Sequence, residues 1–176
     1  MSTEFPSINR FRAAALHLLI SSIICLLLFS VLIFFWYPAP YFSASGGWQG
    51  LQLVVLVDLV LGPFLTLIVF NPQKTRKELS VDLTLIGLVQ VLALGWGVMS
   101  VYQQRPVAAV YWQGSFYTVP AQSLTSQGET LNQLAGFGSS RPVYVYAEPP
   151  SSQAEHDAML AELAETSIPP HEQVER

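Results

Sequence analysis

The sequence is short of charge. Charged residues make up 11% of its 176 positions and hydrophobic residues 51%, whereas a soluble domain carries about 25% charged residues. This composition predicts a membrane protein, and the net charge of −4 gives no reason to expect a nucleic-acid partner. Cys25 is the one cysteine, so an internal disulfide is excluded, and its apolar surroundings favour a packed or lipid-facing side chain over a redox group.

Patterns typical of enzymes and metal sites are missing as well. Two clusters contain ligand types, Glu155-His156-Asp157 and His171-Glu172, but neighbours on a helix point in different directions and neither cluster has a metal-ligand spacing. No G-x-S-x-G nucleophile signature and no phosphate-binding glycine loop occurs. We therefore predict no catalytic site, no metal and no cofactor.

The chain has instead three long apolar segments, at about residues 13–37, 51–70 and 81–102. About 20 apolar residues in a helix span the ~30 Å hydrocarbon core of a bilayer. A cleaved signal peptide is the alternative for the first segment, because basic residues precede it and Ser43-Ala44-Ser45 offers small residues. Its apolar core is longer than such signals use, however, and it ends in the interfacial pair Trp36-Tyr37. Residues 1–102 are therefore predicted to form a membrane α-helical anchor of three transmembrane helices.

The basic residues indicate the orientation of this anchor. If the helices alternate in direction, one side of the membrane receives Arg10, Arg12, Lys74, Arg76 and Lys77. The other side has no basic residue in its short loop, and only Arg105 lies just beyond the third helix. Because basic residues concentrate on the cytoplasmic side, we expect a cytoplasmic N-terminus and an exported segment after Tyr102.

Residues 103–176 predict a small extracytoplasmic α+β domain. Residues 107–112 and 115–119 are β-rich runs on either side of Gln113-Gly114, which is typical of a β-hairpin. Residues 143–147 predict a third strand, and residues 121–140 a loop rich in Ser, Gln and Gly with a short helical turn at about residues 129–134. A core this small favours packing on the membrane surface or on a partner.

One amphipathic helix is predicted near the end of the chain, over about residues 153–165. Ser151 or Ser152 can cap it, and one apolar face can be formed by Met159, Leu160, Leu163 and Ala164. The polar residues 167–176 are expected to be frayed or extended.

Asp58 is the strongest candidate for a functional residue. A charge at the centre of a membrane helix costs roughly 2.5–3.5 kcal/mol on insertion scales, so it should face protein or water. Pro63 lacks a backbone donor and clashes with the carbonyl four residues earlier, which predicts a kink near residues 59–63. An ion or partner site and a purely structural buried carboxylate, protonated or bonded to neighbouring helices, both remain open for Asp58.

Depth along the helices limits the partners of Asp58. At about 1.5 Å per residue, Gln90 and Trp96 lie at depths from which either can donate to its carboxylate. His17 lies nearer the cytoplasmic face, so no direct His17–Asp58 pair is expected. Asp82 is roughly 16 Å away in depth, which argues against an intramembrane aspartyl protease, and its position predicts that it caps the third helix.

Two further sets of residues are candidates for contact with a partner. Gly62, Gly95 and Gly97 would let another helix approach closely. The hairpin carries four aromatic side chains, although core packing is the commoner use of such residues: Tyr111, Trp112, Phe116 and Tyr117.

Several short motifs occur in a specific order: Arg12, His17 and Leu18 as R-x-x-x-x-H-L, then Trp36-Tyr37-Pro38, Asp58 with Gly62-Pro63-x-Leu65-Thr66, Asp82-Leu83, Gln90, Gly97 and Arg105-Pro106-Val107. In this order, residues 10–107 resemble the TfpX/TfpZ family of type IV pilin accessory proteins. The likeness continues loosely to about Pro170, and relatives are expected to run somewhat further.

The resemblance implies a small bacterial inner-membrane protein, without enzymatic activity, that is needed for assembly or function of its cognate pilus. We expect the lipid bilayer and the major type IV pilin or the pilus assembly machinery as partners. In this hypothesis the anchor holds the hydrophobic helix of the pilin while the periplasmic domain touches the pilin head. Two alternatives stay open: a structural subunit of a larger membrane complex, and a small membrane enzyme or ion-conducting protein that uses Asp58.

Overall fold

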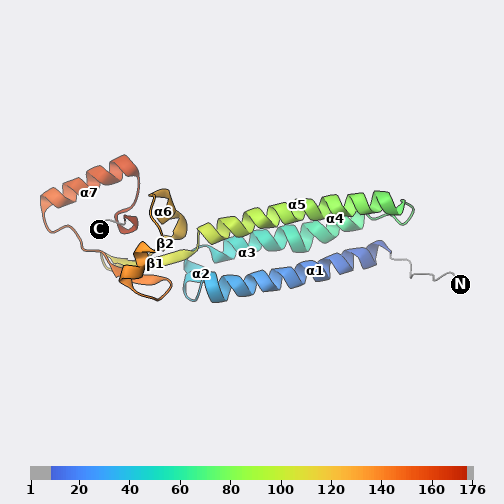
Figure 1. The fold of residues 1–176 in the computed structure, drawn as a ribbon, viewed down its shortest axis with the longest axis horizontal. Coiled ribbons are helices and arrows are strands. Elements are labelled where there is room, and N and C mark those ends of the chain that lie inside the picture. The colour runs from blue at the N-terminus through green and yellow to red at the C-terminus, as the bar shows by residue number, and fades with distance from the viewer. Residues whose placement is uncertain (1–8, 174–176) are drawn as a thin grey trace. The chain divides into compact units, whose positions relative to one another are not determined.

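The computed structural model describes residues 9–173. The chain divides between Val101 and Tyr102 into two compact units. The helical unit comprises residues 9–101 and the sheet unit residues 102–173, and each is described by itself (Figure 1).

Three long helices form the helical unit and run side by side (Figure 1). The first is α1 (Arg10–Val31), which continues as the π-helical η1 (Leu32–Trp36). The second joins α3 (Gly47–Val55), the π-helical η2 (Leu56–Leu61) and α4 (Gly62–Val69). The third is α5 (Arg76–Gln103). By length and composition all three are able to cross a membrane.

The first and third long helices begin several residues before the predicted apolar segments, because polar capping residues determine where each helix starts. Asn9 caps α1 by accepting a hydrogen bond of 2.9 Å from the Arg12 N–H. Before α5, the Glu78 carboxylate accepts from the Thr75 N–H at 2.9 Å, and Thr75 Oγ1 accepts from the Glu78 N–H at 3.3 Å. This capping box starts α5 at Arg76 and not at residue 81.

The predicted role of Asp82 as a helix cap is therefore wrong. Asp82 lies inside α5, beyond the capping box, where the backbone N–H groups already have partners in the helix. Its carboxylate forms an ion pair of 2.6 Å with Lys74 Nζ instead.

A π-helical turn lies where the sequence predicted a kink near residues 59–63. Pro63 has no N–H and would press on the carbonyl four residues earlier in a regular α-helix. In η2 the Gly62 N–H donates to the carbonyl of Val57, five residues back. The π-helical segment Leu56–Leu61 accommodates the proline in this way, and Asp58 lies within it. Such π-turns are frequent at functional sites.

The connection between the first two helices is more ordered than the predicted loop. It contains α2 (Tyr41–Ala44) and the first turn of α3. The buried Tyr37 hydroxyl donates to the carbonyl of Val101 at 2.8 Å. The ring of Phe42 meets Phe29 and Trp48 edge-on. These contacts close the helical unit at this end.

The sheet unit is built on three strands in the order β2-β1-β3. Strand β1 (Pro106–Trp112) pairs antiparallel with β2 (Ser115–Pro120) and parallel with β3 (Val143–Tyr146). Gln113 and Gly114 both have positive φ, as two-residue hairpin turns require. The predicted hairpin and third strand are confirmed.

Residues 121–140, predicted as a loop with a short helical turn at residues 129–134, contain more helix than expected, and the turn lies later in the chain. These residues form α6 (Ala121–Ser126) and the 3₁₀ helix η3 (Gln133–Phe137). The polar composition suggested a loop, but Ala121, Leu124 and Leu134 are buried against the sheet. Burial of these few apolar side chains outweighs the weak helix propensity of their polar neighbours.

The final helix, α7 (Gln153–Thr166), begins where predicted, because Ser152 Oγ accepts from the Glu155 N–H at 3.2 Å. Of its predicted apolar face Met159 is buried while Leu160 is exposed. The chain then forms η4 (Pro170–Glu172), so the expectation of a frayed or extended end is wrong for these residues. Residues 174–176, which share that expectation, lie outside the described residues.

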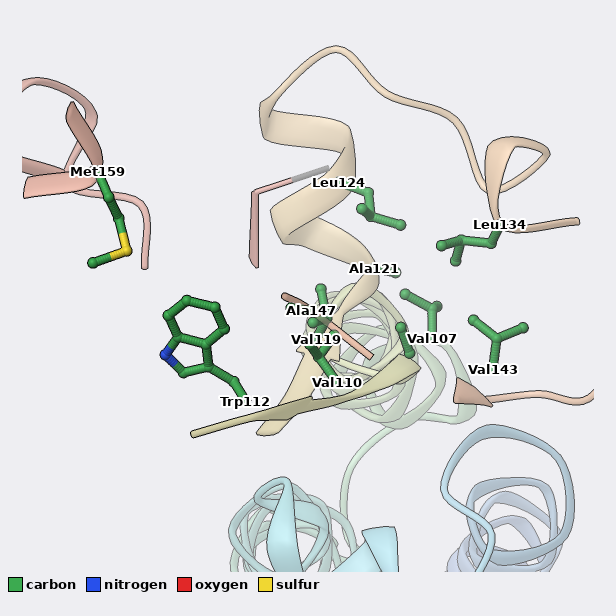
Figure 2. Close-up of a cluster of buried hydrophobic side chains, with 11 residues drawn as sticks. Val107, Val110, Trp112, Val119, Ala121, Leu124, Leu134, Val143, Ala147 and Met159 are labelled. Carbon is green, nitrogen blue, oxygen red and sulfur yellow. The ribbon is translucent and has the colours of Figure 1, made fainter. Parts of the chain in front are cut away.

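Apolar side chains fill the space beside the sheet (Figure 2). Val110, Trp112 and Val119 come from the hairpin, and Figure 2 shows Met159 of α7 pointing toward the indole of Trp112. Trp112 is therefore a core residue and is not available as part of a binding face.

Candidate functional site

One face of the second long helix carries a polar stripe, which we define as Asp58, Gly62 and Thr66. They follow one another at intervals of four residues, so they lie one turn apart on the same face. All three are buried. Since the rest of this helix is strongly apolar, the stripe must be held by its neighbours in the helical unit.

His17 of α1 meets the stripe at Thr66. Its Nδ1 and the Thr66 hydroxyl share a hydrogen bond of 2.7 Å, and α1 packs against α4 along this face. The bond joins residues that are 49 positions apart. Nothing in the sequence pattern indicated it, although both residues belong to the motifs that carry the family resemblance.

Gly62 makes room for two polar side chains from different helices. A Cβ at this position would overlap the amide of Gln90 of α5 and would lie 3.0 Å from Nε2 of His17. The absence of a side chain therefore lets α1 and α5 bring their polar groups to the same point of the second helix. Pro63 follows directly and fixes the adjacent π-turn.

Asp58 is 5% exposed, yet no hydrogen bond to its carboxylate occurs within residues 9–173. The predicted donor Gln90 lies over Gly62, and the indole of Trp96, the other predicted donor, is 79% exposed. His17 shares a hydrogen bond with Thr66, and its imidazole is close enough to interact electrostatically with Asp58. The carboxylate oxygens are not fully enclosed, but a carboxylate largely removed from water without a hydrogen-bond partner is costly, so this arrangement calls for an explanation.

Asp58 borders two cavities of the helical unit. A groove of about 400 Å³ runs between α1 and α5, and its polar lining includes His17, Asp58, Thr66 and Gln90. A second cavity of about 210 Å³ lies between Asp58 and the segment of α5 that carries Trp96 and Gly97. Of the predicted glycines, Gly97 is buried, whereas a Cβ on Gly95 would meet open space.

The predicted aromatic residues of the hairpin separate into two faces. Tyr111 and Phe116 gather with Tyr144 and Tyr146 on the face opposite the core, where ring centroids of neighbours are 5.1–6.5 Å apart. We call these four residues the aromatic face. Tyr144 and Tyr146 were not predicted, although the alternation in Val143-Tyr144-Val145-Tyr146 places both tyrosines on one side of a strand.

Tyr117 lies on the other side of β2 and stacks on His171 of η4, with ring centroids 4.2 Å apart. Burial lowers the pKa of His171 below its ordinary value, and the Glu172 carboxylate at 3.9 Å opposes this shift. Glu172 also accepts a hydrogen bond of 2.7 Å from Ser123 of α6. Tyr117 is thus part of a structural contact and not of the aromatic face.

The remaining motif residues have the following positions in the structure. Tyr37 joins the first and third helices, as described above, with Trp36 in the turn before it and Pro38 in the turn after it. The guanidinium of Arg105 lies 3.6 Å from the ring centre of Tyr102 and donates to the Tyr102 carbonyl. Pro106 opens β1 opposite Pro120. Within residues 9–173, no group of three or more His, Cys, Asp or Glu side chains is placed to hold a metal ion.

These features define a class of protein: three long apolar helices with a buried polar stripe, followed by a small α+β unit. The family model of the fimbrial assembly protein FimB matches residues 6–46. The chain is also similar to the fimbrial assembly protein of serogroups C1 and C2 of Dichelobacter nodosus. The two are 37% identical over 100 residues, which make up 57% of this chain and 76% of the relative. The chain therefore belongs to the fimbrial assembly protein FimB family.

The fimbrial assembly proteins of serogroups E1 and I of the same organism are also 37% identical over 100 residues. In these longer relatives the matched stretch spans 39% of the protein. No solved structure matches the chain. The finer assignment to the TfpX/TfpZ type stays a prediction.

Proposed function

We propose that this protein is a membrane accessory factor of type IV pilus assembly that binds the pilus subunit. The observation that carries the proposal is its 37% identity across 76% of a fimbrial assembly protein. The description of the family, fimbrial assembly protein, supports a role in assembly and names no catalytic activity. We assign no catalytic residue.

The protein acts from the inner membrane, with its N-terminus in the cytoplasm and the sheet unit in the periplasm. The three apolar helices support this location, and the basic residues at positions 10, 12, 74, 76 and 77 support the orientation by the positive-inside rule. A reporter fused after Tyr102 should be active in the periplasm. Activity in the cytoplasm alone would overturn the orientation.

Two surfaces contact the pilin in this proposal. The hydrophobic helix of the pilin enters the groove that is lined by Asp58, Thr66 and Gln90, within the bilayer, where small residues and polar contacts drive helix association. The aromatic face meets the pilin head. Support for the second contact comes from Phe116, which is 67% exposed beside Tyr111, because exposed aromatic clusters are enriched at protein interfaces.

Piliation in a deletion strain tests the proposed function. Loss of the gene should reduce surface pili, counted by electron microscopy, and the full chain should restore them. Normal piliation in the deletion strain would overturn the proposal.

Crosslinking to pilin tests the two contacts. The variants Asp58→Leu and Phe116→Ser should each reduce the capture of pilin, whereas Leu160→Ser, which changes an exposed apolar residue of α7, should not. Unchanged capture by both Asp58→Leu and Phe116→Ser would remove the pilin contacts.

A further inference from the structure

We propose that the groove between α1 and α5 receives one face of an apolar helix from a partner, and that a single basic group on this helix pairs with Asp58. The inference rests on the proposed membrane location and gives the chemistry of the helix that is bound. It names a property that the partner must have, whichever subunit of the pilus system supplies it.

The buried carboxylate is the first observation. Asp58 is 5% exposed and has no hydrogen-bond partner within residues 9–173, while its side chain lines the groove. Intramembrane acids usually pair with another polar or charged group. A basic group entering the groove would give Asp58 a charge-assisted hydrogen bond, which is about twice as strong as a neutral one.

The chain itself has no Lys or Arg to offer within its long apolar segments. Residues 13–73 and 78–104 contain neither Lys nor Arg. His17 interacts electrostatically with Asp58, but its Nδ1 is bonded to Thr66 and no hydrogen bond joins it to the carboxylate. A second copy of this protein would bring the same helices, whose Lys and Arg residues also lie at their ends. A Lys or Arg partner for Asp58 must therefore come from a different chain.

The shape of the groove favours a helix over a small ligand. Its walls extend from Ala13 to Ile24 on α1 and from Leu83 to Leu94 on α5, which is about 16 Å, or three turns, on each helix. Apart from the polar floor, these walls are apolar, and Ile20 and Val91 are exposed. A Cβ at Gly87 would meet open space, so a neighbouring backbone is able to approach there.

Binding of designed single-span peptides to the full-length protein in phosphatidylcholine vesicles tests this inference. The probe is a helix of Leu and Ala with one central Lys, and matched peptides carry Leu or Glu at that position. A photocrosslinking residue replaces Ile20, which lines the groove, or Leu26, which is exposed on α1 outside it. We expect at least tenfold more capture of the Lys peptide than of the Leu peptide from position 20, and little capture from position 26.

Two variants separate charge recognition from loss of structure. Asp58→Asn should reduce capture of the Lys peptide to the level of the Leu peptide, while Asp58→Glu, which keeps the charge, should retain most of it. Equal capture of the Lys and Leu peptides by the wild-type protein would overturn the inference. Crosslinks from position 20 to a second copy or to lipid alone would also overturn it.

The outcome is independent of the pilus assay. Selective capture of the Lys peptide with normal piliation in the deletion strain would support the inference about the groove and contradict the proposed function. Reduced piliation without selective capture would support the proposed function and contradict the inference about the groove.

Discussion

The two units of this protein are built on opposite patterns of burial. In the helical unit many of the large apolar side chains point outward, and the buried polar side chains among the described residues, Ser21, Asp58 and Thr66, all lie there. In the sheet unit the buried residues are apolar and form one cluster around Trp112. In lipid, the environment that we propose for the helical unit, the hydrophobic effect does not favour contact between helices, so polar contacts and close packing would select the neighbours. In water, burial of apolar area provides the driving force. The units should therefore respond to different kinds of substitution.

The largest effect is expected from a core truncation in the sheet unit. Trp112→Ala removes a buried indole and should cost about 3–5 kcal/mol. A domain of this size has about that much stability to lose, so the sheet unit should unfold while the helical unit stays intact. Limited proteolysis of the full-length protein in detergent would show rapid cleavage confined to residues 102–173.

A matched substitution on the same hairpin sharpens this result. Phe116→Ala truncates an aromatic ring that is 67% exposed, and exposed positions usually change stability by about 0.5 kcal/mol or less, with some addition here from the ring contacts of Phe116. Its proteolysis pattern should resemble that of the wild type. Equal sensitivity of both variants would contradict the division into a buried and an exposed set of aromatics.

The sequence was most informative where a local rule decides the structure. The Gln113-Gly114 turn between two β-rich runs predicted the hairpin, and Ser152 predicted the start of α7; both are found. The start of α5 was misplaced because hydropathy reports the apolar stretch and not the cap. The Thr75-x-x-Glu78 pattern is typical of a capping box and would have predicted that α5 starts at Arg76.

The candidate site was predictable only in part, because its decisive contacts link distant positions. A carboxylate in an apolar segment identified Asp58, but no local pattern says which residue of α1 faces which residue of α4. The bond between His17 and Thr66 and the place of Gln90 over Gly62 depend on how the helices pack. Likewise, α6 forms because Ala121 and Leu124 find a sheet to cover.

An intermediate effect is expected from one polar contact in the helical unit. Thr66→Val keeps the shape of the side chain and removes the hydrogen bond to His17. Hydrogen bonds between membrane helices contribute about 0.6 kcal/mol on average, with a maximum near 1.7 kcal/mol, and the variant should lose stability in this range. Unfolding in mixed micelles with increasing SDS would measure it.

Ser22→Ala is the control for this variant. The Ser22 hydroxyl donates to the carbonyl of Leu18 in its own helix, at 2.7 Å, and makes no link between helices. Its removal should leave the SDS midpoint nearly unchanged. A loss as large as that of Thr66→Val would mean that interhelical polar contacts are not what holds the helical unit together.

The smallest effect is expected from titration of His171 in the sheet unit. Burial lowers the pKa of this side chain below its ordinary value of 6.5, and Glu172 only partly offsets the shift. Between the pKa of the unfolded state and the lowered pKa of the folded state, the folded protein binds fewer protons. The stability that neutral His171 contributes is therefore complete above about pH 6.5 and is lost as the pH falls through the lowered pKa.

Protonation of His171 should release η4 from Tyr117 without unfolding the sheet, because the apolar core that includes Trp112 does not titrate. The protection of the amides of residues 171–173 against hydrogen exchange, corrected for the intrinsic pH dependence of exchange, should fall in mild acid, while the protection of β1 stays constant. His171→Phe preserves a ring against Tyr117 but cannot titrate, so it should abolish this pH dependence; if the dependence persists in that variant, another group controls the contact.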